Sequence, residues 1–116
     1  MQRLFIEDIH CFAYHGCLKE ESKIGGNFTV SVDMDLDLTA AMASDKLSDT
    51  ADYVLIHRIV REEMAIPSKL IEHVANRILN RLRKELPAVH RFRVMVKKHN
   101  PPVNGQLGSA TVVLEG

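Results

Sequence analysis

The amino-acid sequence predicts an α+β fold, in which a four-stranded antiparallel sheet carries two helices on one face in the order ββααββ. Two observations lead to this prediction. Residues 27–39 alternate strictly between apolar and polar side chains, which is typical of a strand with one buried face. Apolar residues then recur at helical spacing between residues 53 and 86, and alternation returns near the carboxyl terminus. Such a chain forms two sequential hairpins that flank a pair of helices.

The first strand is expected over residues 3–12, where Leu4, Ile6 and Ile9 alternate loosely with polar residues. Residues 13–26 follow as a long loop that holds three glycines and the charged run 19–23. A loop of this length is more than a hairpin needs, and long loops are usually functional or disordered.

The second strand is the clearest element of the sequence. From Phe28 to Leu38 every second residue is apolar, so we expect one face to be buried and the other to face water. Strands usually run about five or six residues, so this hairpin is long for a small domain and leaves an extended edge to be covered. Closure of a barrel across several subunits is one way to cover it.

The helical region begins after a connector with a possible short helical turn at residues 40–43. Asp49, Thr50 and Asp52 are possible helix caps, and residues 53–64 have the apolar spacing of a first helix. Pro67 and Ser68 are a start signal for a second helix that runs to about Leu86. The face of this helix that should pack inward consists of Leu70, Ile71, Val74, Ile78 and Leu82.

Glu72 lies one step from that apolar face, in the first turn of the second helix. The helix dipole favours a carboxylate there. A carboxylate on a rigid helix start beside apolar side chains suits a flat ligand that carries two adjacent N–H donors. The alternative is a solvent-facing glutamate that only complements the dipole.

Two further strands, 91–97 and 109–115, are expected on either side of the rigid turn 100–105.

Composition limits the possible functions. The 116 residues suffice for one domain, 1–116, and 46% of them are hydrophobic. Fifteen basic residues balance fifteen acidic ones, which argues against a nucleic-acid partner and gives no attraction to membranes. Near-zero net charge fits a protein that associates with itself. No apolar run approaches a membrane span and no signal-peptide core is present, so we expect a cytoplasmic protein.

Several common catalytic signatures are missing, among them a phosphate-binding glycine loop, a serine nucleophile elbow and a histidine pair at metal spacing. Cys11 and Cys17 match no zinc pattern, and we expect buried or half-buried thiols. Neither a metal nor a cofactor is therefore expected. What remains is Glu21, Tyr53 and Lys98 at turns and element ends. A partly desolvated lysine can shuttle protons and a tyrosine hydroxyl can relay them, although each residue taken singly also suits packing or solvation.

Taken in order, these groups resemble one family. The chain resembles dihydroneopterin aldolases in five motifs: Tyr14-His15-Gly16-x-Leu18-x-x-Glu21, then Gly25, then Asp49-Thr50-x-Asp52-Tyr53, then Leu70-Ile71-Glu72, then Lys98-x-Asn100-Pro101-Pro102. Each motif alone is weak, but five at these spacings are specific and span nearly the whole chain. The tunnelling fold of this family is also ββααββ, in agreement with the order expected from the residue pattern.

The resemblance implies a retro-aldol cleavage in folate biosynthesis, in which 7,8-dihydroneopterin gives 6-hydroxymethyl-7,8-dihydropterin and glycolaldehyde, with 2′-epimerisation as a side activity. It implies that Glu72 binds the pterin 2-amino group and N3–H, with backbone contacts from Ile71 and Leu18. Lys98 and Tyr53 would be catalytic, the tyrosine coming from a neighbouring subunit, and Glu21 would hold Lys98. Neither metal nor cofactor is implied. Two stacked rings of four subunits, each ring closing its sheets into a barrel, would form a homo-octamer.

Two readings remain open beside the aldolase. A dihydroneopterin triphosphate 2′-epimerase would need a basic cluster, of which residues 97–99 (Lys-Lys-His) are a modest version. A pterin-binding protein without activity would need chiefly Glu72. Zinc-dependent relatives of this fold need three histidine ligands, which the scattered histidines here do not suggest. Gly26 and the stretch 105–110 depart from the usual family pattern and bear on substrate fit or on the subunit interface.

Overall fold

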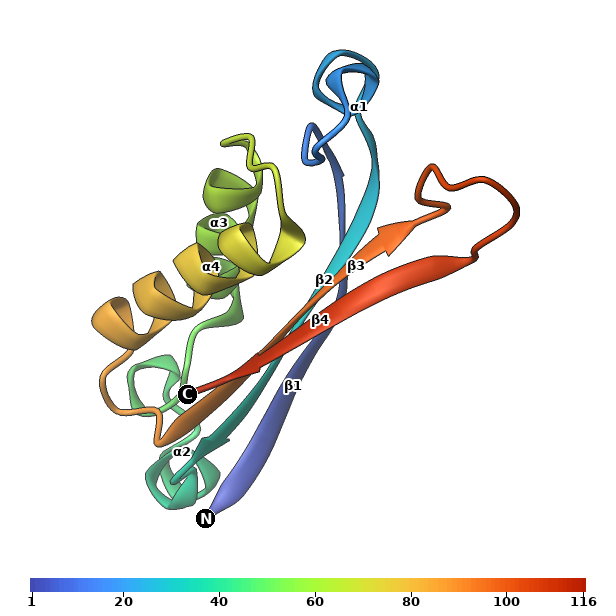
Figure 1. Cartoon of the computed structure of the whole chain (residues 1–116). Coiled ribbons are helices and arrows are strands. Elements are labelled where there is room, and N and C mark those ends of the chain that lie inside the picture. Colours follow the sequence, from blue (N-terminus) through green and yellow to red (C-terminus); the bar gives the residue numbers. More distant parts are fainter.

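The computed structural model describes all 116 residues and is built on one antiparallel sheet. Its strands lie in the order β1-β2-β3-β4, and Figure 1 shows helices α3 and α4 covering one face. The strands are β1 (Gln2–Ala13), β2 (Gly26–Leu36), β3 (Arg91–His99) and β4 (Ser109–Glu115), and the two long helices are α3 (Tyr53–Met64) and α4 (Ile71–Glu85). The predicted sheet, helix pair and element order are confirmed.

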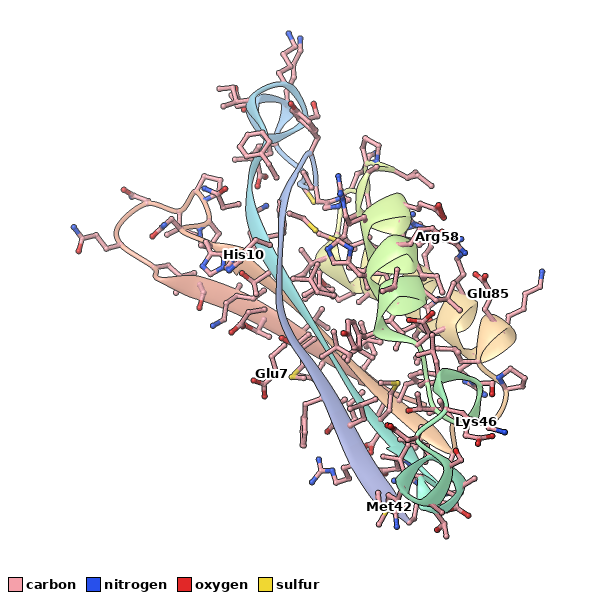
Figure 2. All side chains as sticks on the ribbon, turned by 180° about the vertical axis from the view of Figure 1, so that it is seen from behind. Glu7, His10, Met42, Lys46, Arg58 and Glu85 are labelled. Carbon is pink, nitrogen blue, oxygen red and sulfur yellow. The ribbon has the colours of Figure 1, made fainter.

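The hydrophobic core lies between the sheet and the two long helices. Viewed from behind in Figure 2, side chains fill this space, whereas Arg58 of α3 and Glu85 of α4 point away from it. Strand β2 contributes most, because it is paired on both sides and places Phe28, Val30 and Met34 under the helices at 1% exposure or less. Strands β1 and β4 form the edges of the sheet, so the twelve-residue β1 has one unpaired side.

The open face of the sheet corrects the prediction that the polar side of the second strand faces water. Thr29 is only 7% exposed and Asp33 only 3%. Asp33 is covered because Arg3 of β1 and Arg93 of β3 reach its carboxylate from both sides, at 2.6 and 3.2 Å. Long polar side chains of the flanking strands therefore bury the polar face. The strand also ends at Leu36, earlier than the alternation suggested.

A bulge in β1 explains why its apolar alternation is loose. The pairing with β2 shifts register between Ile6 and Ile9, and Asp8 adopts a positive φ of 58°. The Asp8 N–H donates to the Ser31 hydroxyl at 3.0 Å, so the extra residue keeps a hydrogen-bond partner. Figure 2 shows Glu7 and His10 on the side of β1 that faces away from α3.

The start of α4 differs from the prediction. The helix begins at Ile71, so Pro67 and Ser68 lie in the preceding loop, and Leu70 is 50% exposed at the N-cap position rather than packed inward. Ser68 does not cap the helix because its polar groups have other partners, including Arg77, which binds its hydroxyl at 2.9 Å. The buried face of α4 consists of Val74, Ala75, Ile78, Leu79 and Leu82.

The smaller elements lie at the two ends of the sheet. The expected helix cap is present before α3, where Asp52 accepts from the Val54 N–H at 2.9 Å. The expected helical turn is α2 (Thr39–Ser44), followed by the 3-10 turn η1 (Leu47–Asp49). The long loop after β1 contains a helix that was not predicted, α1 (Lys19–Ile24), at the top of Figure 1. No helix is both long enough and apolar enough to cross a bilayer.

Candidate active site

An ion pair at the α1 end of the sheet joins two segments that are distant in sequence. Lys98 is the last residue but one of β3, and its Nζ pairs with the Glu21 carboxylate of α1. The same Nζ donates to the His15 carbonyl at 3.1 Å. Both charged side chains are largely buried, at 16% and 13% exposure. A desolvated ion pair with a further hydrogen bond is a rigid arrangement that water screens little.

Local backbone geometry fixes the Glu21 carboxylate. Its second oxygen accepts from the Leu18 N–H at 3.2 Å, which closes the first turn of α1. The carboxylate lies against Gly16, whose φ is 158°, and a Cβ on this residue would collide with it. Glycine is therefore the only residue that leaves room for the carboxylate at this point.

A cavity of about 250 Å³ opens beside the ion pair. Its wall includes Glu20, Phe28, His99 and Asn100 in addition to the paired residues. The Lys98 ammonium lies 5.8 Å from the centre of the Phe28 ring, within the range of a cation–π contact. The volume is smaller than the roughly 300–1,000 Å³ of typical ligand pockets, so one chain encloses only part of a ligand of that class.

The other predicted site residues do not line this cavity. Tyr53 is 63% exposed at the first position of α3, the end of that helix farther from α1 in Figure 1. Glu72 is exposed in the first turn of α4, Ile71 beside it is partly buried, and Leu18 is half-exposed before α1. Within one chain the structure thus brings Lys98 and Glu21 together and leaves Tyr53, Glu72, Ile71 and Leu18 outside the cavity.

Contacts between two loops connect the ion pair to the start of α4. The Ser68 N–H donates to His15 Nδ1 at 3.0 Å, and the Gly16 N–H donates to the Ser68 carbonyl at 2.9 Å. The Cys17 thiol donates to the Lys69 carbonyl at 3.3 Å. Cys17 is exposed, which corrects the expectation of a buried or half-buried thiol, because the loop presents it at the surface; Cys11 is partly buried.

Sequence reasoning missed the burial of His15, which is 1% exposed rather than a surface turn residue. A histidine before a glycine has the appearance of a turn, and no periodicity marks it as buried. Burial lowers the pKa of His15 to about 4, and the positive charges of Arg77 and Lys98 act in the same direction, against an opposing contribution from the Met64 carbonyl. The ring is therefore neutral at pH 7, and because Nδ1 accepts a hydrogen bond its proton is on Nε2.

This shift makes folding stability depend on pH. The unfolded chain binds a proton at His15 with a pKa of about 6.5 and the folded chain at about 4, so acidification between these values favours unfolding. We expect the contribution of His15 to be complete above about pH 6.5 and to decline by up to about 3 kcal/mol as the pH falls through 4. Urea unfolding midpoints measured at intervals from pH 7 to pH 4 test this.

The control for this prediction is His15→Asn, which removes the titrating group and keeps an acceptor near the position of Nδ1. Stability of this variant should change less over the same interval. Equal losses in the two proteins would show that other groups cause the pH dependence.

Residues that could hold a metal do not cluster: no three histidine, cysteine, aspartate or glutamate side chains gather at one point. A smaller polar group on the open face of the sheet surrounds Thr29, whose hydroxyl oxygen lies 2.6 Å from His99 Nε2 and 3.4 Å from His10 Nδ1.

Comparison with known proteins gives a consistent result. Residues 4–115 match the family model described as dihydroneopterin aldolase. The chain is 35% identical over 117 residues to the dihydroneopterin aldolase of Streptococcus pyogenes serotype M6, covering 99% of this chain and 98% of that one. Its fold matches the structure of E. coli dihydroneopterin aldolase in complex with neopterin, with a TM-score of 0.91, 21% identity and coverage of 100% and 99%. It also matches a dihydroneopterin aldolase from Burkholderia thailendensis bound to guanine, with a TM-score of 0.78, 20% identity and coverage of 99% and 89%.

Proposed function

The chain belongs to the dihydroneopterin aldolase family, and on this premise we propose that Lys98, held in place by Glu21, takes part in the proton transfers of its reaction. The activity is that of an aldehyde-lyase, which cleaves 7,8-dihydroneopterin into 6-hydroxymethyl-7,8-dihydropterin and glycolaldehyde. The observation that carries the assignment is the buried ion pair of these two residues at the wall of a cavity. Buried ionisable groups in a cleft are candidates for acid–base catalysis.

The substrate supplies the electron sink of the reaction, so the protein needs to supply only acid–base groups. The C6=N5 bond of the dihydropterin acts as the imine that many aldolases build with a lysine, and protonation of N5 turns it into an electron sink. A base removes the 2′-hydroxyl proton, the C1′–C2′ bond breaks, C2′ becomes the aldehyde carbon, and the electron pair forms the enamine at C6 and C1′. An acid then protonates C1′. Positioned acid–base groups contribute about 10²–10⁴-fold each.

We assign these proton transfers to Lys98, with Tyr53 of a neighbouring subunit as the second group. The positive charge of the Lys98 ammonium is balanced by Glu21, and its Nζ also donates to the His15 carbonyl. These two contacts fix the position of Nζ beside the cavity.

Glu72 is the proposed anchor for the pterin ring. The 2-amino group and N3–H of a pterin are adjacent donors, and guanine presents the same pair on its pyrimidine ring, which agrees with the guanine bound by the Burkholderia relative. Two charge-assisted hydrogen bonds to one carboxylate would be worth roughly 1.5–3 kcal/mol each. The backbone groups of Ile71 and Leu18 are proposed to complete the ring contacts. For Ile71 this agrees with its place at the start of α4, where the first N–H groups have no partner within the helix.

A complete site requires a second subunit in this proposal. Tyr53 and Glu72 lie at the surface, and the cavity beside Lys98 is small. The edge strands β1 and β4 each have one unpaired side that can pair with a neighbouring sheet. Long unpaired edges favour such pairing with another chain. We therefore propose a homo-octamer of two stacked tetramer rings, in which sheets close into barrels and active sites form between subunits, with a cytoplasmic location and no metal or cofactor.

A dihydroneopterin triphosphate 2′-epimerase is the second candidate, and the charges around the cavity count against it. Glu20 and Glu21 line the cavity with Lys98, so carboxylates outnumber the one lysine. Lys97 does not add to the positive charge there, because adjacent strand residues point to opposite faces of the sheet. A triphosphate close to this cavity would meet repulsion, which favours the free triol as substrate.

The test is to incubate the purified protein with 7,8-dihydroneopterin in the presence of a chelator and to separate the products by chromatography. Release of 6-hydroxymethyl-7,8-dihydropterin and glycolaldehyde is the expected result. Because the chelator is present, this result would also show that the reaction needs no metal. An untouched triol together with an epimerised triphosphate would favour the second candidate. If neither substrate reacts while neopterin still binds, the chain is a binding protein without catalysis.

A further inference from the structure

We propose that His15 is a positioning residue that couples Lys98 to the segment carrying Glu72, so that the proton-transfer group and the ring anchor keep a fixed separation. This inference rests on the proposed function, since it takes Lys98 and Glu72 as parts of one reaction. It concerns a residue at the cavity wall whose ring is hydrogen-bonded to the Ser68 N–H and not to the Glu21 carboxylate.

The first link runs from Lys98 to the loop before α4. Lys98 Nζ donates to the His15 carbonyl at 3.1 Å, while His15 Nδ1 accepts from the Ser68 N–H at 3.0 Å. The adjacent Gly16 N–H donates to the Ser68 carbonyl at 2.9 Å. The two loops are thus joined at both backbone polar groups of Ser68, one of them through the imidazole ring.

The second link runs from Ser68 into α4. Its hydroxyl accepts from Arg77 Nη2 at 2.9 Å and lies 2.9 Å from His73 Nδ1. Arg77 and His73 both belong to the first two turns of α4, the turns in which Glu72 stands. Displacement of Ser68 would therefore be transmitted to the start of the helix.

The ring itself is held in one orientation. It packs edge-to-face on Phe28, with ring centres 5.1 Å apart at an interplanar angle of 79°, and Phe28 also lies below the Lys98 ammonium. Burial, and after it the positive charges of Arg77 and Lys98, lower the pKa of His15, so the imidazole stays neutral and its Nδ1, which binds the Ser68 N–H, is available as an acceptor. A side chain here must be flat, buried and able to accept one hydrogen bond.

The expected consequence of losing that acceptor is misplacement of the reacting groups rather than loss of the fold alone. The Ser68 N–H would be left without a partner, and the loop that supplies the carbonyl for Lys98 would move away from α4. A shift of about 1 Å in a positioned catalytic group can cost on the order of 10²-fold in rate.

The experiment compares His15→Asn, whose amide oxygen can accept near the position of Nδ1, with His15→Leu, which has no acceptor. We expect His15→Leu to lower kcat for 7,8-dihydroneopterin by about 10²-fold and to weaken neopterin binding several-fold, and His15→Asn to restore both to within about tenfold of the wild type. Val32→Ala, a core change in the middle of β2, is the control for stability, because Val32 is 1% exposed and contacts neither loop through a hydrogen bond. It should lower the melting temperature and leave kcat unchanged.

A double-mutant cycle tests whether His15 acts through Lys98. In the Lys98→Ala background, His15→Leu should change the residual rate by less than about threefold, because the group that it positions is absent. If His15→Leu does not fold, His15→Gln serves instead. Its longer side chain places the amide beyond the position of Nδ1, so it should lower kcat and, unlike His15→Asn, should not restore it.

Two results would overturn the inference. One is a wild-type kcat in His15→Leu or in its substitute His15→Gln. The other is an equal loss of kcat in the leucine and asparagine variants. An inactive wild-type protein would instead overturn the proposed function, and the neopterin affinities of the same variants would still decide whether His15 supports the Glu72 segment.

Discussion

Lys98→Ala should lower the turnover of 7,8-dihydroneopterin by about 10³-fold, while the affinity for neopterin changes by less than about tenfold. The physical reason is that the substitution removes the only ammonium at the cavity wall and leaves the Glu21 carboxylate buried without its partner. Ring binding, in contrast, depends on the proposed contacts to Glu72 at the start of α4. Steady-state kinetics and fluorescence titration with neopterin measure the two effects separately.

The matched control is Lys97→Ala, which removes the same charge from the adjacent residue of β3. Lys97 is exposed and makes no ion pair with Glu21, so its loss should leave both kcat and affinity nearly unchanged. Turnover that survives in Lys98→Ala, or falls equally in both variants, would remove Lys98 from the proton transfers.

Glu72→Gln should weaken neopterin binding by about 10- to 100-fold. The amide presents one acceptor and one donor where the ring offers two donors, so one hydrogen bond is lost and the charge that strengthens the other is removed. The effect should appear mainly in the dissociation constant and in KM, with a smaller change in kcat, because the anchor holds ground state and transition state alike.

Glu85→Gln makes the same chemical change at the opposite end of α4, where the carboxylate pairs with Arg81 at 2.6 Å. Its affinity for neopterin should equal that of the wild type. Unaltered affinity in Glu72→Gln would mean that Glu72 only complements the helix dipole, the alternative that the sequence left open.

Some elements with clear periodicity could be predicted with their boundaries, although the second strand and the second helix were not. The apolar spacing of residues 53–64 and the alternation of residues 109–115 correspond to the observed α3 and β4. Helix α1 could not be predicted in this way, because its six residues bury no side chain within a periodic face. Its features that depend on the tertiary structure are the pair of Glu21 with Lys98 and the contact of Glu21 with Gly16, and it ends at Gly25, at a φ of 77°.

The burial of polar residues was the main difference between expectation and structure. Alternation tells which residues of a strand share a face, but not whether the neighbours of that face have side chains long enough to cover it. Arg3 and Arg93 cover Asp33, and this could be inferred only once the strand order and register were known. His15 was missed for the same reason, since its partner Ser68 is 53 residues away.

The candidate site shows the same limit. Lys98 and Glu21 are 77 residues apart, so no local pattern relates them, and the expectation that Glu21 holds Lys98 came from the family resemblance. In the structure the two side chains form an ion pair, and their roles in catalysis stay a proposal. The roles of Tyr53, Glu72, Ile71 and Leu18 stay proposals, because these residues lie outside the cavity of the single chain.

The contact between Gly16 and the Glu21 carboxylate has a consequence for how this chain can diversify. Any side chain at residue 16 would occupy the volume of the carboxylate, so the carboxylate would have to leave its present place beside Lys98 even when residue 21 itself is untouched. A lineage that retained glutamate at 21 but accepted alanine at 16 would keep the acid in its sequence and displace its carboxylate from the position seen here. We therefore expect substitutions at residues 16 and 21 to depend on each other.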